Sequence, residues 1–318
     1  REKCIAIGEL DDAALAFGIE RVNPNTAVNI LHFARGAKTA YELAVMRLAA
    51  ERGAAGHVAA EGAFRDGKSE FDIHRAYCKA VSHTDSELPY SNIIALNEHS
   101  AVLHYTDLDR AAPATLRSFL IDAGAQVHGY ASDITRTYSN GDQRFQALVD
   151  RMEAMELGIV ARVQAGIDFR DLHVDTHKML AALLVDAELA TGDADTLLET
   201  GVTSTFFPHG LGHLLGVQVH DVGGHQENEA GSIIDPPSGH PFLRLTRILE
   251  EDMVLTIEPG LYVIDMLLEN LRGSAGERHV NWDTVDWLRP FGGVRIEDNI
   301  RVMANGRENL TRDAFSRL

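Results

Sequence analysis

Phe119-Leu-Ile-Asp122-Ala-Gly-Ala-Gln-Val-His-Gly-Tyr-Ala-Ser-Asp133-Ile-Thr-Arg-Thr indicates two short strands joined by a turn at His128-Gly129. If the hairpin folds about positions 127 and 128, Asp122 and Asp133 face each other across the antiparallel pair, with Cβ atoms about 5 Å apart. Carboxylates placed in this way repel each other unless a cation lies between them or they share a proton. A slipped register that separates the two aspartates is the alternative.

Helices and strands alternate around this hairpin. Capping signals, such as Thr39 with Glu42, and apolar periodicity predict helices at 39–62, 69–80, 145–163 and 170–189. Strand-like runs follow each helix pair, at 92–97, 117–123 and 132–138 and then at 253–264 and 293–303. This repeated order predicts an α+β fold with an internal duplication, although no residue-level repeat is visible.

The ends and loops of the chain suggest its domain organisation. Residues 1–37 carry no strong period and begin with Arg rather than Met, so we interpret them as the tail of an N-terminal domain or linker, whose upstream part is absent. Residues 38–318 then form one domain. Within it, the run from Gly223 to His240 is rich in Gly, Pro, Asn and Ser and predicts a long surface loop.

Composition excludes several classes of protein. The 318 residues include 47 acidic and 29 basic side chains, a net charge of −18, which argues against a nucleic-acid partner. The two cysteines cannot make a disulfide framework, so we expect a reducing compartment, the cytoplasm. The longest apolar run, Met179 to Val185, is too short to span a membrane. Fifteen histidines among many carboxylates leave a metal-binding protein as an attractive class.

Two motifs suggest functions that their contexts do not support. Gly62-Ala-Phe-Arg-Asp-Gly67-Lys68-Ser69 matches the P-loop pattern, but a helix rather than a strand is predicted before it. His173 and His177 are spaced i, i+4 on a predicted helix and could bind zinc, yet no third ligand is evident nearby. We therefore interpret the two histidines as an exposed or core-satisfied pair.

Three further segments offer ligands or catalytic groups. Glu258 in Thr256-Ile-Glu-Pro-Gly and Glu297 in Gly292-Gly-Val-Arg-Ile-Glu-Asp-Asn each follow an apolar Ile in a β-like run. Glycines beside Leu211 in Phe207-Pro-His209-Gly-Leu-Gly-His213 prevent a helix and indicate a closely approached backbone. Taken singly, such glutamates are usually solvated and such histidines structural.

The order Asp122, Asp133, His213, Glu258 and Glu297, in these contexts, resembles the pita-bread metallopeptidases. The segments around His209–His213, Val219-His-Asp-Val-Gly-Gly and Arg244-Leu-Thr-Arg247 are similar to those of bacterial Xaa-Pro dipeptidases, a sequence group shared with organophosphorus acid anhydrolases. The resemblance covers Lys38 to Asp313. In that family an N-terminal domain precedes the catalytic one, which fits the interpretation of residues 1–37.

The resemblance implies a dinuclear centre that hydrolyses Xaa-Pro dipeptides through a metal-bridging water or hydroxide. Asp122 would ligate one ion, His213 and Glu258 the other, while Asp133 and Glu297 bridge the two. Such an oxygen-rich set suits Mn²⁺ best, with Co²⁺ or Zn²⁺ as alternatives. Two ions a few ångströms apart can lower the pKa of a shared water and polarise the scissile carbonyl.

The same resemblance implies roles around the metals. Glu258 would pass a proton to the leaving nitrogen, and His220 and His104 would stabilise the tetrahedral intermediate. Substrate binding falls to Arg295, His209 and Arg247. Arg247 is expected to meet the C-terminal carboxylate, its alternative being a surface arginine paired with Glu250 or Glu251.

The expected activity is dipeptidase, with organophosphate triester hydrolysis as a side reaction. The alternatives are cleavage of longer Xaa-Pro peptides, as by aminopeptidase P, and a non-catalytic pita-bread binding module. A homodimer is expected from the family alone.

Overall fold

The first half of the chain builds two helices against a three-stranded antiparallel sheet. The computed structural model describes residues 4–9, 19 and 21–318. Helix α3 (Ala40–Arg65) begins at a complete capping box of Thr39 and Glu42, and Ser69 caps α4 (Glu70–Val81), so both predicted helices are confirmed. The sheet has the order β1-β2-β5, with strands β1 (Ile93–Leu96), β2 (Ser118–Asp122) and β5 (Thr135–Ser139).

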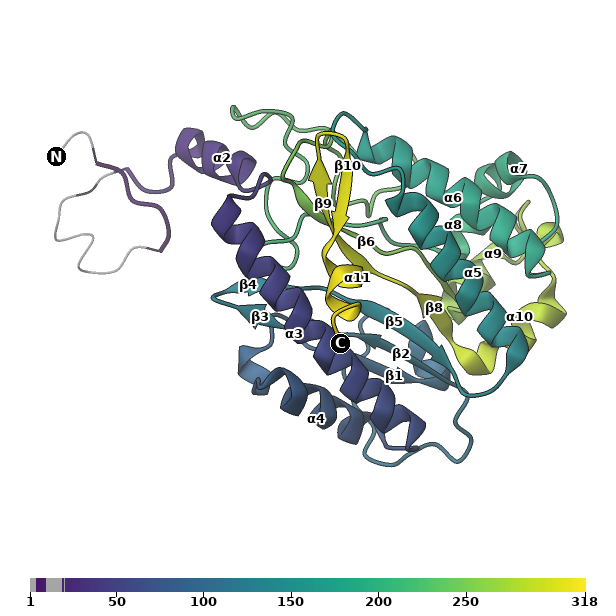
Figure 1. The fold of residues 1–318 in the computed structure, drawn as a ribbon. Helices are drawn as coiled ribbons and strands as arrows, with labels where there is room; N and C mark the ends of the chain where they lie inside the picture. The colour runs from purple at the N-terminus through teal and green to yellow at the C-terminus, as the bar shows by residue number, and fades with distance from the viewer. Residues whose placement is uncertain (1–3, 10–18, 20) are drawn as a thin grey trace.

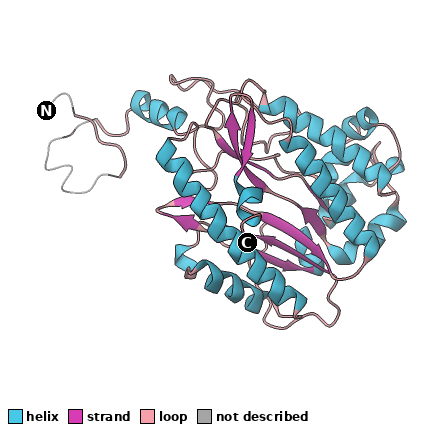
Figure 2. Cartoon of the chain, in the orientation of Figure 1, coloured by secondary structure: helices cyan, strands magenta, loops and turns pink. Residues whose placement is uncertain are grey.

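The second half repeats this order. Helices α5 (Gln143–Val160) and α6 (Phe169–Asp186) precede a second sheet, ordered β10-β9-β6. Its strands are β6 (Val254–Ile257), β9 (Asp298–Met303) and β10 (Gly306–Asn309). An isolated bridge between Thr135 and Glu297 connects the two sheets, and the helix pairs pack on their outer sides (Figures 1 and 2). The predicted α+β fold with an internal duplication is confirmed.

Two predicted strands are each interrupted at a glutamate. The run predicted at 253–264 forms β6 and then β7 (Gly260–Tyr262), with Glu258 and Pro259 between them. The run predicted at 293–303 forms β8 (Gly293–Arg295) and β9, with Glu297 between them. Strands β7 and β8 pair with each other as a separate two-stranded ladder. Glu258 and Glu297 therefore lie between strands and are not part of the regular strand pairing.

The hairpin that contains the two aspartates has a different register from the predicted one. Asp122 pairs with Thr135, so partners sum to 257 rather than 255. The turn lies at His128 and Gly129, both with positive φ (48° and 83°), as a two-residue hairpin turn requires. The predicted centre at 127–128 would place a β-branched valine at such a position. The pairing register is thus shifted by two residues. Because side chains alternate with a period of two, Asp122 and Asp133 still point to the same face of the hairpin.

Short elements complete the fold. The hairpin tip carries β3 (Gln126–Val127) and β4 (Tyr130–Ala131). The remaining helices are α2 (Asn25–Ala34), α7 (Ala194–Glu199), α8 (Val202–Phe206), α9 (Asp265–Leu271), α10 (Trp282–Leu288), α11 (Leu310–Phe315) and the 3₁₀ turns η1 (Asp85–Glu87), η2 (Asn97–Ala101), η3 (Glu277–His279) and η4 (Arg289–Phe291). Helix α2 lies in a region where the sequence shows no period. None of the described helices is long and apolar enough to cross a membrane.

The apolar interior forms separate clusters for the two halves. The larger cluster lies under α5 and α6, where Phe145 stacks on Phe291 with ring centroids 4.6 Å apart. The smaller one lies between α3, α4 and the first sheet, around Phe64 and Phe119. Residues 207–253, which include the predicted loop at 223–240, contain isolated bridges but no helix or strand. These clusters fix the two sheets, and the polar residues gather between them.

Candidate metal centre

The five predicted ligands come together where the two sheets meet. Asp122 ends β2, and Asp133 lies just before β5. The Tyr90 hydroxyl lies 2.8 Å from Asp122 Oδ1 and 2.5 Å from Asp133 Oδ1, so one hydroxyl spans both carboxylates. Ligand atoms of Asp133, His213 and Glu297 all lie within 4.8 Å of one another, and all three residues are buried.

His213 presents one ring nitrogen to the acids. Its Nδ1 lies 3.0 Å from the carbonyl oxygen of Leu214, which it reaches as a donor, so that Nε2 keeps its lone pair. Nε2 lies 3.4 Å from Asp133 Oδ2 and 3.6 Å from Glu258 Oε1. The preceding residue must be glycine, since a Cβ on Gly212 would lie 1.9 Å from the carbonyl oxygen of Thr256. The predicted close approach of this backbone is confirmed.

Crowded carboxylates dominate the electrostatics of the centre. Burial raises the pKa of Glu258 to about 7, and the charges of Asp133 and Asp122 add to the effect. Burial and the neighbouring acids Asp133, Glu258 and Asp122 hold the pKa of Glu297 well above its ordinary value. The pKa of Asp122 is also raised, by burial and then by Asp133, although the charge of Arg295 opposes this. Protons or cations must therefore neutralise part of this cluster at neutral pH.

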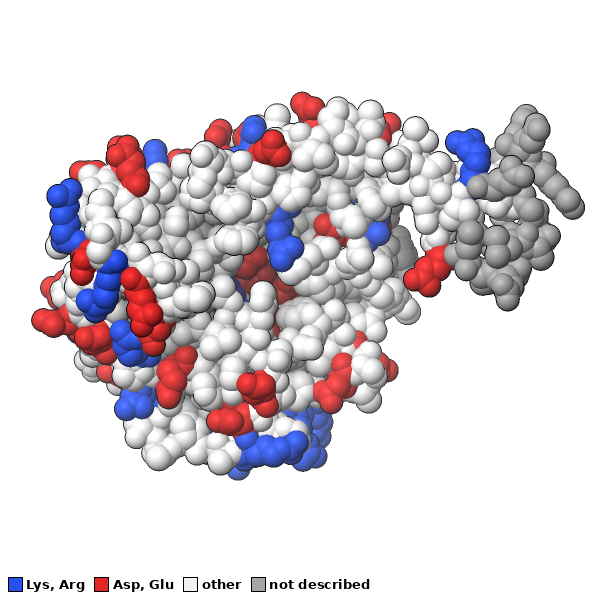
Figure 3. Space-filling model, turned by 180° about the vertical axis from the view of Figure 1, so that it is seen from behind, with Lys and Arg blue, Asp and Glu red and all other residues white. Residues whose placement is uncertain are grey.

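The donor set fits two divalent ions. Four carboxylates supply hard oxygen ligands and a formal charge of −4, and one imidazole nitrogen completes the set. Figure 3 shows a hollow on the face turned away in Figure 1, with acidic atoms at its floor and basic atoms close by. The buried cluster thus has both the charge and the ligand types that a divalent-metal centre needs.

Arg295 holds the centre through buried hydrogen bonds. Its Nη2 lies 2.6 Å from Asp122 Oδ2, and its Nη1 donates to the Tyr262 hydroxyl at 2.8 Å. The Tyr262 hydroxyl in turn lies 2.8 Å from Nε2 of His209. Burial, then the charge of Arg295, lowers the pKa of His209 to about 3, so this ring is neutral at pH 7. Tyr262, to which sequence reasoning assigned no role, therefore links Arg295 to His209.

Two more predicted histidines lie beside this group. The His220 ring stands edge-on to the His213 ring, with centroids 4.4 Å apart. Partial burial, followed by the charges of His213 and Arg244, lowers the pKa of His220 to about 4. His104 is exposed and close enough for its charge to lower the pKa of both His220 and His209. His209 and His220 are thus neutral groups along one side of the acidic cluster.

Arg247 is neither free nor at the surface. Its Nη2 lies 2.7 Å from Glu250 Oε1, its Nη1 donates to the carbonyl oxygen of Phe33 at 3.1 Å, and its guanidinium carbon lies 3.9 Å from the Phe33 ring centroid. The residue is only 2% exposed. The predicted alternative partner, Glu250, is therefore present, but the arginine is buried under α2. Arg244, three residues earlier, is exposed and acts on His220.

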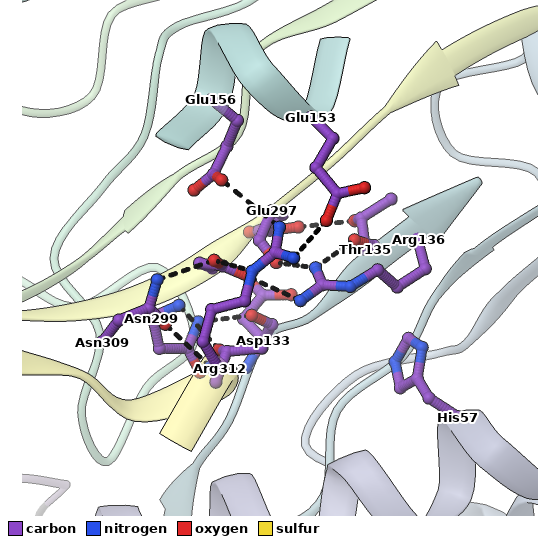
Figure 4. A network of polar contacts seen from close by, with 12 residues as sticks. His57, Asp133, Thr135, Arg136, Glu153, Glu156, Glu297, Asn299, Asn309 and Arg312 are labelled. Carbon is purple, nitrogen blue, oxygen red and sulfur yellow. Dashed lines mark hydrogen bonds and ion pairs between the residues drawn. The ribbon is translucent and has the colours of Figure 1, made fainter. Parts of the chain in front are cut away.

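A second set of charges supports the metal-facing strands from behind (Figure 4). Asn299 Oδ1 accepts the backbone N–H of Asp133 at 3.0 Å. Arg136 donates to the carbonyl oxygen of Glu297 at 2.8 Å and to Asp298 Oδ1 at 2.6 Å. Sequence reasoning missed these residues, although Asp298 and Asn299 directly follow Glu297 in the motif. The signal was their position, because alternation places the side chain directly after Glu297, that of Asp298, on the opposite face, where it meets Arg136.

The P-loop-like segment at residues 62–69 lacks the strand that a phosphate-binding loop needs before it. Residues 62–65 are the last turn of α3, and Ser69 accepts the backbone N–H of Asp72 as the cap of α4. Gly67 has a φ of +70° and makes the turn between the two helices. The segment is a helix–turn–helix connection, as the sequence analysis expects.

Comparison with known proteins agrees with this site. The chain matches the family described as Metallopeptidase family M24 over residues 44–304. It is 53% identical over 317 residues to a Xaa-Pro dipeptidase of Xanthomonas campestris pv. campestris, covering 99% of this chain and 71% of that protein. It is 52% identical over 307 residues to a Xaa-Pro dipeptidase of Shewanella piezotolerans, covering 96% and 70%.

Solved structures give the same result at lower identity. A low-pH form of aminopeptidase P from Escherichia coli matches with a TM-score of 0.75 and 27% identity, over 98% of this chain and 68% of that one. Sequence family, fold and ligand types thus agree, and the chain belongs to metallopeptidase family M24 with a pita-bread fold.

Proposed function

We propose that this chain hydrolyses Xaa-Pro dipeptides at a dinuclear metal centre. The observation that carries the proposal is the convergence of Asp133, His213 and Glu297 within 4.8 Å between the two sheets, with Asp122 and Glu258 beside them. About half of all positions are identical to relatives named Xaa-Pro dipeptidase. Burying several carboxylates together lowers the stability of the fold, and a non-catalytic binding module would gain nothing that offsets this loss.

The proposed ligand roles rest on the family resemblance. Asp122 would hold one ion and His213 with Glu258 the other, while Asp133 and Glu297 would bridge the two. We favour Mn²⁺, because oxygen donors outnumber nitrogen donors. Two bound divalent ions would supply an activated water and polarise the scissile carbonyl.

The surrounding side chains have separate tasks. Glu258, whose carboxylate lies 3.6 Å from Nε2 of His213, is proposed to accept a proton and return it to the leaving nitrogen. His220 is neutral at pH 7, and we propose that it and the exposed His104 donate an N–H to the developing negative charge of the intermediate. His209, whose ring nitrogens lie near the Gly210 carbonyl oxygen and the Tyr262 hydroxyl, is proposed to contact substrate.

Recognition of the substrate carboxylate is assigned to the segment 244–247. Arg247 was the predicted group, but its guanidinium is occupied by Glu250 and Phe33. We propose that exposed Arg244 meets the carboxylate and that Arg247 holds the segment in place. Arg244→Ala should then raise KM for a dipeptide by about tenfold or more, the value of one charged hydrogen bond. Arg247→Ala should raise this KM too and should also lower the stability of the protein. If KM is unchanged in Arg244→Ala, Arg247 rather than Arg244 binds the carboxylate.

The remaining proposals concern the protein as a whole. We propose that residues 1–37 belong to an N-terminal domain or linker and that 38–318 form the catalytic domain. We also propose a homodimer in the cytoplasm and a side activity on organophosphate triesters. Gel filtration with light scattering tests the homodimer, and an assay with a phosphotriester tests the side activity.

One experiment separates the dipeptidase from an aminopeptidase P-like enzyme, which the structural match makes the second candidate. Manganese-loaded protein is assayed on Ala-Pro and on a longer peptide with the same first two residues. Cleavage of Ala-Pro is expected, and cleavage of the longer peptide alone would favour the second candidate. Asp133→Ala should abolish both metal retention and activity, whereas the exposed Asp235→Ala is the matched control that should change neither.

A further inference from the structure

Three histidines form a cluster separate from the five predicted ligands. His173 and His177 lie on α6, and their spacing predicts an exposed or core-satisfied pair with no third ligand evident in the nearby sequence. The pair does lie in the core, but its ring nitrogens are not satisfied, and a third histidine lies beside it. His173 and His177 are each only 1% exposed, none of their four ring nitrogens has a hydrogen-bond partner among the described residues, and His240 lies directly against them.

The missing partners need a physical explanation. A buried polar atom is nearly always hydrogen-bonded, because losing water without a replacement is costly. Here four imidazole nitrogens are buried without a partner in one place. A simple apolar core would be more stable with leucine or phenylalanine at both positions. An ion that accepts the one lone pair of each neutral ring would give a partner to two of these four nitrogens, one on His173 and one on His177.

The geometry of the cluster suits a single metal ion. The i, i+4 spacing places His173 and His177 on one face of α6, with ring centroids 4.8 Å apart. The His240 ring centroid lies 4.6 Å from that of His173 and 4.5 Å from that of His177. One nitrogen from each ring lies within 4.8 Å of the others. Tetrahedral coordination at 2.0–2.1 Å needs nitrogen separations of about 3.4 Å, so any two nitrogens must approach each other by no more than about 1.4 Å.

The chemistry of this cluster differs from that of the acidic centre. Its three donors are imidazoles with no carboxylate among them, a set that favours zinc, copper or nickel over manganese. Burial lowers the pKa of His173 to about 2 and that of His177 to about 3, so both rings are neutral, as metal ligands must be. His240 is partly exposed, which leaves a route for the ion and for a fourth ligand from solvent.

We propose that His173, His177 and His240 bind one zinc-type ion, separate from the dinuclear centre. This ion would fasten the surface loop 223–240 to α6. The loop continues past His240 into Leu243, whose Cα lies 2.9 Å from where a Cβ on Gly210 would be, and then into Arg244. Phe207 packs on His177 and on His209, with centroids 5.1 and 4.7 Å apart. The ion would thus stiffen the wall behind the substrate-facing residues.

Zinc counting tests the proposal without reference to activity. Full-length protein is stripped with a chelator, reloaded with excess Zn²⁺, separated from free metal and analysed for zinc. His240→Ala and His177→Leu should each bind one equivalent fewer than the unaltered protein. His128→Asn, at an exposed turn, and Cys78→Ser, in another potential metal-binding group, should show no such loss. Unchanged zinc in both cluster variants would overturn the site.

A second measurement identifies the ligands and the role. With Co²⁺, the difference spectrum between the unaltered protein and His240→Ala should show the visible bands of a four-coordinate nitrogen site, and a featureless difference would refute it. His240 is partly exposed on a loop, so this variant should fold even if His177→Leu does not. Zinc should slow amide exchange at 223–243 in the unaltered protein but not in His240→Ala. Equal exchange with and without zinc would overturn the fastening role.

Discussion

Replacing Glu258 by glutamine should stabilise the metal-free protein at alkaline pH, although the same change should destroy the metal centre. The side chain is 16% exposed, and burial together with neighbouring acids raises its pKa to about 7 from the ordinary 4.5. A raised carboxyl pKa means that the folded state prefers the protonated form. The corresponding stability is fully present below pH 4.5 and is lost as the pH rises through 7.

The size of the effect follows from the same two pKa values. A difference of about 2.5 pKa units, at 1.36 kcal/mol each, amounts to about 3 kcal/mol. Glutamine is neutral at every pH and keeps an oxygen for the Thr256 hydroxyl, which lies 3.3 Å from Glu258 Oε1. The free energy of unfolding of Glu258→Gln should therefore exceed that of the unaltered protein by about 3 kcal/mol at pH 8, relative to their difference at pH 4.5.

The assay is urea unfolding of chelator-treated protein between pH 4.5 and 8, followed by circular dichroism. The difference between the two proteins isolates the glutamate from other titrating groups. With saturating Mn²⁺ the order should reverse, because the metals need the ionised carboxylate. A difference that stays constant with pH in the metal-free proteins would refute the electrostatic reasoning, and no reversal with Mn²⁺ would refute Glu258 as a ligand.

Three further predictions concern stability. Mn²⁺ at 100 times its dissociation constant should raise the free energy of unfolding by about 2.7 kcal/mol for each ion bound, and calorimetry that shows no shift in Tm would contradict a folded-state site. Phe145→Ala should cost about 3–5 kcal/mol, because the ring is fully buried against Phe291; a loss below 1 kcal/mol in urea unfolding would show that the core collapses around the gap. Thr39→Ala should cost about 1 kcal/mol by removing the cap of α3, whereas Thr39→Ser should cost little; equal losses would exclude the hydroxyl as the cause.

Local signals predicted the helices because their causes are local. Thr39 and Ser69 each cap a helix through residues three positions away, so four letters suffice to locate each start. The hairpin was harder. Apolar alternation indicated both strands, but the register depends on which two residues adopt positive φ, and here these are His128 and Gly129. The predicted register was wrong by two residues, and because that number is even, Asp122 and Asp133 were still placed correctly on the same face of the hairpin.

Features that depend on distant packing could not be predicted. Arg247 is buried because Phe33, more than 200 residues earlier, covers it. His240 meets α6 through a loop that has no periodicity, so the two helical histidines seemed to lack a third partner. Tyr90 and Tyr262 join the centre from segments with no motif of their own. In each case the partner is supplied by tertiary contact, which spacing along the chain does not encode.

The bridge between Thr135 and Glu297 has a consequence for the order of events during synthesis. Asp122 and Asp133 leave the ribosome long before Glu258 and Glu297, and neither pair alone surrounds an ion. The centre exists only after the second sheet has docked on the first. Metal capture is therefore a late event of folding rather than its nucleus, and a chain that ends before Glu258 lacks two of the five ligands and cannot assemble the centre.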